Sequence, residues 1–506
     1  MEKKLFGTDG IRGVAGEAPL DSPTIFAAGL CLGRYLHSKA PHPRVIVGED
    51  TRESSRWIAE TVAAGLNEAG AEILAVGVIT TPGLAYLTAL EGFAAGVMIS
   101  ASHNPYRDNG IKVFASTGYK LPDEDEKEIE GKIFLALGNK SGPQARRLAL
   151  DPDRLLVRKY IDFLRRVAPS PGSLAGQKLL IDCANGSASA VAGEVFSGLG
   201  MELKILSDQP DGKNINLGCG SLHLENLQRA VLEERADLGV AFDGDADRAL
   251  FVSGKGRVID GDGVLLAASR YMKRLGALRG NAVVGTLMTN LGLERALARE
   301  GLKLLRTPVG DKYVLEELLR AGCNLGGEQS GHVIFRDLAT TGDGLLTALQ
   351  ILRIMAEERR TLEDLVAGLV VFPQTIRNVR VREKVPLESL PQVMDEIRAS
   401  EERLGNSGRI VVRYSGTELL ARVMVEAETD ERWSGTPRRS SAPSSTVSGQ
   451  CEGKSAQADR ARGGSGVTEK RRSQRVSRNI TIQLLGMQPG ESSAAAQPAR
   501  TIEVSQ

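Results

Sequence analysis

The feature that most constrains the fold is an alternation of short apolar segments and helical stretches, which repeats three times over the first 370 residues. The apolar segments are nearly continuous, and this is typical of strands that are buried on both faces of a sheet. The predicted strands are 45–49, 71–78 and 94–100, then 178–186, 203–208 and 238–245, and finally 281–290, 302–310 and 321–328. A helix over 55–69 separates the first two. The sequence therefore predicts three similar mixed α/β sheet domains.

The pattern changes after Phe372 and Pro373. One strand-like segment, a helix over 387–401 and two further strand-like segments predict a smaller α+β domain. A chain of 506 residues is also too long for one hydrophobic core. The predicted domains are 1–153, 154–256, 257–370 and 371–430.

Residues 431–506 differ from the rest of the chain. They are rich in Ser, Gly, Arg and Gln, and no aromatic residue follows Trp433. Such a segment buries too little apolar surface to offset its ordering entropy, so we predict a disordered tail. Composition and charge change together near Thr429, which suggests a frameshift or readthrough product. Resequencing of the 3′ end tests this hypothesis, and a basic RNA- or membrane-binding tail is the alternative.

Composition narrows the function classes. The five cysteines are scattered without a C-x-x-C pair, which predicts reduced thiols in the cytoplasm. No apolar run reaches the length of a membrane span, and the N-terminus has no signal-peptide pattern. The main body is mildly acidic, which argues against nucleic-acid binding. Phosphate-binding P-loop, dinucleotide and G-x-S-x-G motifs are absent from the sequence.

The first candidate site is the loop 100–105, which directly follows an apolar strand. Asn104 and Pro105 favour a turn, so the Ser102 hydroxyl is predicted to be exposed and held at the strand end. The following residues would turn Lys112 back toward the same loop. Ser102 is therefore a candidate nucleophile, although an ordinary polar turn fits the same residues.

The second candidate site is the acidic loop that follows the strand 238–242. Asp243, Asp245 and Asp247 alternate with small residues, so their carboxylates can converge if the loop curls. Hard oxygen ligands suit Mg²⁺. An EF-hand is excluded because its sixth position holds Arg248 and its twelfth holds Gly254. A surface acidic loop is the alternative.

Three further loops carry polar groups beside glycines, and each alone also fits a structural connector. Glu328 and Ser330 can bond sugar hydroxyls or an amine. The segment 413–418, with Arg422 beyond it, offers backbone N–H groups, hydroxyls and two guanidinium groups for a phosphate. The segment 7–13 adds Arg12.

Taken together and in this order, the motifs FGTDGIRG, SASHNPxxDNGIK, DGDADR, GEQSGH and RYSGTE resemble those of the α-D-phosphohexomutase family. The resemblance covers residues 1 to about 428. With Gln329, the fourth motif resembles that of the family branch that uses glucosamine phosphates. The mannose-type branch tends to carry Met at this position. The resemblance implies four domains around a central cleft, with the first three built alike.

The resemblance also implies residue roles. Ser102 would be the phosphoserine, and it would share one Mg²⁺ with the three aspartates. Lys112, His103 and His332 are the candidates for proton transfer, and the assignment among them stays open. The remaining implied roles are charge neutralisation by Arg12 and Arg248, sugar binding by Glu328 and Ser330, and binding of the non-reacting phosphate by Arg413, Ser415, Gly416, Thr417 and Arg422.

The implied activity is an isomerase, an intramolecular phosphotransferase that interconverts glucosamine 6-phosphate and glucosamine 1-phosphate. A sugar 1,6-bisphosphate would be its intermediate and activator, and its product would feed UDP-N-acetylglucosamine and cell-wall precursors. We expect a cytoplasmic monomer or homodimer whose partner is a small hexosamine phosphate, without nucleic acid or membrane. The alternatives are activity on glucose or mannose phosphates, an aspartyl phosphatase with Asp243 as nucleophile, and a non-catalytic sugar-phosphate binder.

Overall fold

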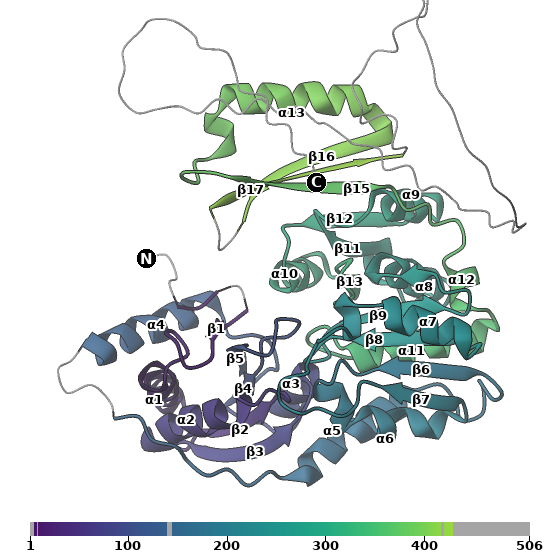
Figure 1. The fold of residues 1–506 in the computed structure, drawn as a ribbon. Coiled ribbons are helices and arrows are strands. Elements are labelled where there is room, and N and C mark those ends of the chain that lie inside the picture. Colours follow the sequence, from purple (N-terminus) through teal and green to yellow (C-terminus); the bar gives the residue numbers. More distant parts are fainter. Residues whose placement is uncertain (1–4, 8, 139–143, 416–418, 429–506) are drawn as a thin grey trace, which may run out of the picture. The chain divides into compact units, whose positions relative to one another are not determined.

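The structure, a computed structural model, describes residues 5–7, 9–138, 144–415 and 419–428 (Figure 1). These residues fall into two compact units that divide between Val371 and Phe372. The predicted disordered tail, 431–506, lies outside the described residues.

The first sheet of the first unit has the strand order β1-β5-β4-β2-β3. Strands β2, β3 and β4 are parallel, while β5 runs antiparallel to β4 and β1 antiparallel to β5. Its strands are β1 (Ile11–Val14), β2 (Arg44–Glu49), β3 (Glu72–Val78), β4 (Ala95–Ile99) and β5 (Asp108–Ala115), and its helices are α1 (Ser22–Lys39), α2 (Ser55–Glu68), α3 (Thr81–Leu90) and α4 (Asp123–Gly138).

Successive side chains of β2 point to opposite faces of this sheet, and helices cover both faces. Val45 and Val47 pack in a core with α1, α2 and α4, whereas Ile46 between them packs in a second core with α3. Helices α1 and α2 approach closely because glycines lie at their contact. A Cβ on Gly29 would stand 2.1 Å from the Val62 carbonyl oxygen, so a larger residue there would push the helices apart.

The second sheet has the order β10-β9-β8-β6-β7, and the third has the order β12-β11-β13-β14. The second block contains α5 (Arg154–Val167), β6 (Lys178–Asp182), α6 (Ala192–Phe196), β7 (Glu202–Leu206), α7 (Glu225–Glu233), β8 (Leu238–Phe242), β9 (Ala249–Ser253) and β10 (Val258–Ile259). The third contains α8 (Gly261–Arg274), β11 (Ala282–Thr286), α9 (Leu291–Arg299), β12 (Lys303–Thr307), α10 (Asp311–Ala321), β13 (Leu325–Gly327), β14 (Val333–Phe335), α11 (Gly344–Glu358) and α12 (Leu362–Leu365).

All three sheets share one strand arrangement, which confirms the predicted repeat. In each sheet the first parallel strand (β2, β6 or β11) lies between the second and the third parallel strands, and an antiparallel strand (β5, β9 or β14) joins the third. The nine predicted strands all overlap observed ones. The antiparallel partners β5, β9 and β14 were not predicted as strands, because their sequences read as the loops that follow the candidate sites.

The second unit contains a three-stranded antiparallel sheet with the order β15-β17-β16. Its elements are β15 (Gln374–Arg380), α13 (Pro391–Leu404), β16 (Gly408–Tyr414) and β17 (Leu420–Ala427). Helix α13 packs on β16. This confirms the predicted small α+β domain. The boundaries predicted between the first three domains stay predictions.

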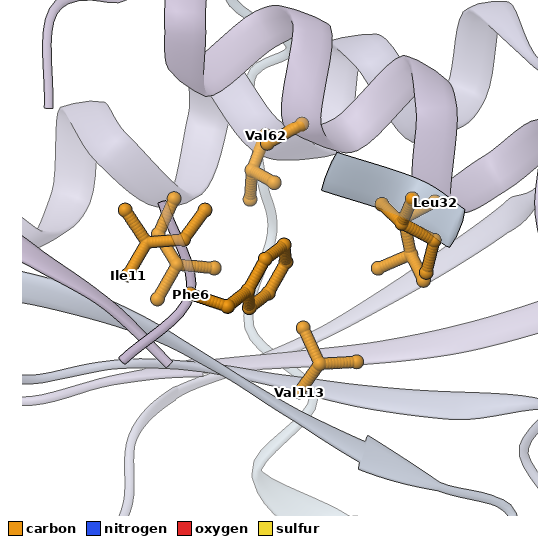
Figure 2. A pocket seen from close by; sticks show the side chains of 8 residues that line it. Phe6, Ile11, Leu32, Val62 and Val113 are labelled. Atoms are coloured by element: carbon orange, nitrogen blue, oxygen red, sulfur yellow. The ribbon is translucent and has the colours of Figure 1, made fainter. Parts of the chain in front are cut away.

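One continuous core joins the three blocks of the first unit. It extends from β2 through Tyr160 on α5 to the helices α8 and α11, and Tyr160 is fully buried. A separate pocket lies inside the first block (Figure 2), and its lining residues are Phe6, Ile11, Ala28, Leu32, Val62, Ile111, Val113 and Ile129. All eight are apolar, so we do not assign chemistry to this pocket. None of the described helices has the length and apolar character needed to cross a membrane.

Candidate active site

The three candidate loops of the first unit occupy equivalent places in the repeat. The Ser102 loop follows β4, the aspartate loop follows β8, and the Glu328 loop follows β13. Each of these is the third parallel strand of its block, and an antiparallel strand follows each loop. Ligands of open α/β sheets gather at the carboxyl ends of strands. The repeat therefore carries one candidate loop per block at the same structural position.

Ser102 lies on the turn between β4 and β5, in a left-handed backbone conformation with φ 52°. Its hydroxyl donates a 2.6 Å hydrogen bond to Asp243 Oδ2. The sequence predicted an exposed hydroxyl, and this was wrong, because Ser102 is only 1% exposed. The aspartate loop covers it. A Cβ on Gly244 would stand 2.5 Å from the Ser102 carbonyl oxygen, so the two loops meet through a glycine.

Asp243, Asp245 and Asp247 converge as the loop curls. The curl is set by Ala246, which adopts φ 57° and donates its N–H to the Asp243 carbonyl oxygen. One carboxylate oxygen from each aspartate lies within 4.8 Å of the others, and all three residues are buried. Asp245 Oδ1 and Asp247 Oδ1 have no hydrogen-bond partner within the described part of the chain. These orphaned oxygens fit a metal ion.

The electrostatics of the triad also favour a cation. Burial raises the pKa of Asp243 well above its ordinary value, and the charges on Asp247 and Asp245 raise it further. Three ionised carboxylates in one buried cluster repel one another unless positive charge balances them. The triad could therefore hold a metal ion.

Lys112 brings positive charge from β5 into the same cluster. Its Nζ lies 2.8 Å from Asp245 Oδ2, 3.1 Å from Asp9 Oδ2 and 3.8 Å from Asp247 Oδ2. Burial lowers the pKa of Lys112, but the carboxylates of Asp245, Asp9 and Asp247 outweigh it and raise the pKa above its ordinary value. Lys112 is therefore a fixed cation that neutralises charge, and it is poorly suited to accept a proton.

His103 lies beside the nucleophile, with Nδ1 3.3 Å from Ser102 Oγ. Burial lowers its pKa to about 4, and Arg248 and Arg12 act in the same direction. The ring is therefore neutral near pH 7. A neutral imidazole at hydrogen-bond distance from a hydroxyl can accept its proton.

His332 has a different environment. Nε2 accepts the Gly342 N–H at 3.0 Å, and Nδ1 lies 3.6 Å from Asp247 Oδ2. Burial lowers the pKa of His332, while Asp247 and Asp311 raise it, with a net rise that favours a proton on both nitrogens. The hydrogen bond from the Gly342 N–H rules out a proton on Nε2, because a protonated nitrogen cannot accept it and the backbone N–H cannot turn away. We assign a neutral ring whose Nδ1–H faces Asp247.

Two arginines flank the cluster. The backbone N–H of Arg248 donates to Asp243 Oδ1 at 3.2 Å, and its Nε lies 3.7 Å from Asp247 Oδ1. Arg12 pairs with Asp9. Both guanidinium groups are half-buried, so they keep access to a ligand while they hold a fixed charge.

Glu328 and Ser330 lie together on the loop between β13 and β14. Glu328 Oε1 accepts the Gly310 N–H at 3.0 Å, and the Ser330 hydroxyl lies 3.5 Å from Glu328 Oε2. Both side chains are half-buried, which leaves them accessible to a ligand. Gly331 is required here because it adopts φ 94° and a Cβ would stand 2.5 Å from the Ala249 carbonyl oxygen.

Several polar residues of this cluster were missed by the sequence analysis. Lys120 pairs with both Asp9 and Asp311, so it links the N-terminal loop to the start of α10. The Thr81 hydroxyl donates to Asp245 Oδ2 at 2.5 Å, and its N–H donates to the Asp245 carbonyl oxygen. The sequence held a weak signal for two of these residues, because Thr81 and Asp311 each begin a helix directly after the loop that follows a strand.

The second unit carries the candidate phosphate cradle. Arg413 on β16 and Arg422 on β17 are register partners, so two guanidinium groups stand on neighbouring strands. Burial and the charge of Arg422 lower the pKa of Arg413. Like charges directly opposite each other are destabilising in a sheet, and a bound anion would relieve them. Ser415 is buried beside them, whereas Gly416 and Thr417 lie outside the described residues.

Four family models match the chain. They are described as phosphoglucomutase/phosphomannomutase domains, namely alpha/beta/alpha domain I over residues 3–137, domain II over 158–256, domain III over 260–371 and the C-terminal domain over 377–436. All the motifs discussed above fall within these ranges.

Individual proteins are similar over most of the chain. A phosphoglucosamine mutase from Solibacter usitatus is 54% identical over 432 residues, which cover 85% of this chain and 96% of that protein. A solved phosphoglucomutase/phosphomannomutase family protein from Burkholderia thailandensis has 25% identity and a TM-score of 0.70, over 84% of this chain and 94% of that one. The fold is shared with Aspergillus fumigatus N-acetylphosphoglucosamine mutase, solved with GlcNAc-6P and magnesium, at 19% identity and a TM-score of 0.57, over 85% of this chain and 93% of that one. The chain belongs to the phosphoglucosamine mutase family and carries the four phosphoglucomutase/phosphomannomutase domains.

Proposed function

We propose that this chain is an isomerase that interconverts glucosamine 6-phosphate and glucosamine 1-phosphate through a phosphorylated Ser102. The observation that carries the proposal is the buried contact between the Ser102 hydroxyl and Asp243, beside two further aspartates. A hydroxyl alone is a weak nucleophile, and phosphoryl transfer requires positive charge beside it. A metal ion held by the aspartates, together with Lys112, would supply that charge. The 54% identity to a phosphoglucosamine mutase supports the choice of sugar.

The proposed cofactor is one Mg²⁺, held by Asp243, Asp245 and Asp247 together with the Ser102 oxygen or its phosphate. Oxygen donors of this kind suit Mg²⁺, and two of the aspartates have a buried oxygen that accepts no hydrogen bond from the described residues. When bound, the ion would neutralise negative charge on the transferring phosphoryl group.

The chemistry has two balanced steps. Phosphorylated Ser102 transfers its phosphoryl group to the free oxygen of glucosamine 6-phosphate, so one P–O bond breaks as another forms, and the sugar hydroxyl loses a proton while Ser102 Oγ gains one. The resulting 1,6-bisphosphate turns over, and its 6-phosphoryl group returns to Ser102 with the reverse proton movement. A sugar 1,6-bisphosphate would also supply the first phosphate.

The roles of the neighbouring residues follow from their charges. His103, which is neutral, exchanges the proton at Ser102 Oγ. Lys112, Arg12 and Arg248 stay charged and stabilise the transferring group. His332 is neutral and orients Asp247, so we remove it from the candidates for proton transfer.

Binding of the sugar phosphate is divided between two sets of residues. Glu328 and Ser330 bond the amine and hydroxyl groups of the sugar. The second unit supplies a site for the phosphate that does not react. Its proposed members are Arg413, Ser415, Gly416, Thr417 and Arg422.

The test is conversion of glucosamine 6-phosphate by the full chain with Mg²⁺ and a trace of hexose 1,6-bisphosphate. Ser102→Ala should abolish turnover, whereas Ser269→Ala, which changes a buried serine in α8, should not. If Ser102→Ala keeps activity and Asp243→Asn loses it, with release of inorganic phosphate, an aspartyl phosphatase replaces the proposal. Faster turnover of glucose or mannose phosphates would overturn the choice of sugar.

A further inference from the structure

Arg52 is a buried arginine that follows β2, and all of its guanidinium N–H groups have acceptors. Nη2 donates to the carbonyl oxygens of Ser102 at 2.9 Å and Asn104 at 2.8 Å. Nη1 donates to the carbonyl oxygens of Pro105 and Asp108. Nε donates to Asp50 Oδ2 at 2.9 Å. One side chain therefore binds four backbone carbonyl groups between residues 102 and 108, in and after the Ser102 loop.

Asn216 contacts two of the same carbonyl groups from a different block. Its Nδ2 donates to Ser102 O at 3.0 Å and to Asn104 O at 3.2 Å. Asn216 lies on the connection between β7 and α7, which belongs to the sheet that carries the aspartate loop. Two side chains from two blocks thus bind the backbone of the candidate nucleophile.

The N–H group of Ser102 is held as well. It donates to Ser100 Oγ at 3.0 Å, and the Ser100 hydroxyl donates to Asp50 Oδ2 at 2.7 Å. Asp50 is the same carboxylate that accepts Arg52 Nε. Asp50 and Arg52 therefore fix both backbone polar groups of Ser102.

These hydrogen bonds hold the backbone of Ser102 in an unfavourable conformation. Ser102 adopts φ 52°, a region that residues with a Cβ rarely occupy and that persists only where surrounding contacts impose it. This conformation directs Oγ to Asp243. Without the bonds to its carbonyl group, the turn would be free to relax to negative φ, and Oγ would move away from the aspartates.

We propose that Arg52 and Asn216 form a carbonyl clamp that positions Ser102 for phosphoryl transfer. The proposal rests on the proposed function. Arg52 is a positioning residue rather than a catalytic one, because its five N–H groups are already used on carbonyl and carboxylate oxygens. It therefore acts on the reaction through the backbone of Ser102. Loss of the clamp should slow the phosphoryl transfer steps and leave sugar binding by Glu328 and Ser330 unchanged.

The test uses two variants of the full chain. Arg52→Lys keeps the charge opposite Asp50, but an ammonium cannot reach the same set of carbonyl groups. Asn216→Gly removes the amide without backbone strain, because Asn216 adopts φ 58°. The matched controls are Arg336→Lys, which also donates to two backbone carbonyls but outside this site, and Asn281→Gly, which also adopts positive φ.

We expect kcat to fall about 100-fold for Arg52→Lys and about tenfold for Asn216→Gly, with KM for glucosamine 6-phosphate within about twofold, since small misplacements of a reacting group cost this much. The controls should keep kcat. Amide exchange of the peptide around Ser102 should become faster in both clamp variants and stay slow in the controls. Because the two side chains share two carbonyl groups, their effects should not add in the double variant.

Unchanged kcat and unchanged amide exchange in Asn216→Gly would overturn the clamp, as would equal losses in the Arg336→Lys control. If Arg52→Lys does not fold, Asn216→Gly alone decides, because it leaves the Asp50–Arg52 pair intact. If the unaltered chain shows no turnover, the proposed function fails. The amide-exchange comparison still decides the clamp in that case, since it needs no substrate.

Discussion

Ser102 Oγ and Asp243 Oδ2 form a buried hydrogen bond of 2.6 Å, although the residues are 141 positions apart in the sequence. Each residue lies just after the third parallel strand of its own block, β4 for Ser102 and β8 for Asp243. The repeat therefore explains the contact, because equivalent strand ends of two similar sheets face one another. The nucleophile and the first carboxylate become neighbours only when the two blocks pack.

Asp243→Asn should have opposite effects on stability without and with Mg²⁺. Burial and the neighbouring aspartates raise the pKa of Asp243, so removal of its charge relieves repulsion in the metal-free protein. The amide oxygen can still accept the Arg248 N–H, and the Ser102 hydroxyl can turn to accept a hydrogen bond from the amide NH₂ group. We expect a higher melting temperature than the unaltered chain in EDTA, and loss of the rise in melting temperature that Mg²⁺ gives the unaltered chain.

The control for this prediction is Asp162→Asn, which changes an exposed aspartate on α5. It should follow the unaltered chain in both conditions. A normal stabilisation by Mg²⁺ in Asp243→Asn would show that Asp243 is not needed to hold the ion.

Lys112→Met should destabilise the protein more in EDTA than in Mg²⁺. The change leaves Asp245 and Asp9 without their ammonium partner, and breaking a buried pair in this way costs about 3–5 kcal/mol. A bound divalent cation would neutralise part of the same charge. Thermal unfolding with and without Mg²⁺ measures this difference, and kcat should fall at least about 100-fold.

Lys178→Met is the matched control. Lys178 also pairs with two carboxylates, Glu202 and Glu234, but at the protein surface, where such pairs contribute little. Equal destabilisation by both variants, or an effect of Lys112→Met that Mg²⁺ leaves unchanged, would contradict the prediction.

Glu328→Gln should shift the choice of sugar. The carboxylate can pair with the ammonium group of glucosamine, whereas an amide keeps hydrogen bonding but loses the charge. We expect kcat/KM to fall about tenfold more for glucosamine 6-phosphate than for glucose 6-phosphate. The ratio of the two kcat/KM values is the measurement. Glu316→Gln, an exposed glutamate on α10, should leave the ratio unchanged, and an unchanged ratio in Glu328→Gln would exclude the pairing.

Asp343→Asn should become more stable than the unaltered chain as pH rises. Burial raises the pKa of Asp343 from 3.8 to about 6, although bonds from Leu346 N–H and the Tyr160 hydroxyl oppose the rise. Because the folded pKa lies above the unfolded one, ionisation costs stability, and the loss develops between about pH 4 and pH 6. The rise corresponds to about 3 kcal/mol.

The measurement is the difference in melting temperature between Asp343→Asn and the unaltered chain from pH 4 to pH 8. Asparagine keeps the cap of α11, so the difference should grow up to about pH 6 and then stay constant. The exposed variant Asp162→Asn should show no such growth. A difference that does not change with pH would mean that Asp343 carries its charge without cost.

Local sequence determined the three blocks and the loops that follow their strands. Continuous apolar runs such as 94–100 and 238–242 have few stable alternatives to buried strands, because their side chains must leave water on both faces. The polar residues that follow them, from Ser102 to Glu328, then fall at strand ends. The aspartate triad was also readable, since alternate carboxylates with small residues between them converge when the loop curls.

Tertiary structure decided the burial and charge state of those residues. The sequence predicted an exposed Ser102, yet packing of the aspartate loop buries it. The sequence also left open which histidine transfers the proton. Their neighbours distinguish the two, because His103 lies among arginines and His332 is fixed by Gly342 and Asp247. The Arg52–Asn216 clamp joins positions far apart in the chain. Desolvation and long-range contacts depend on which blocks pack together, and no local pattern encodes that.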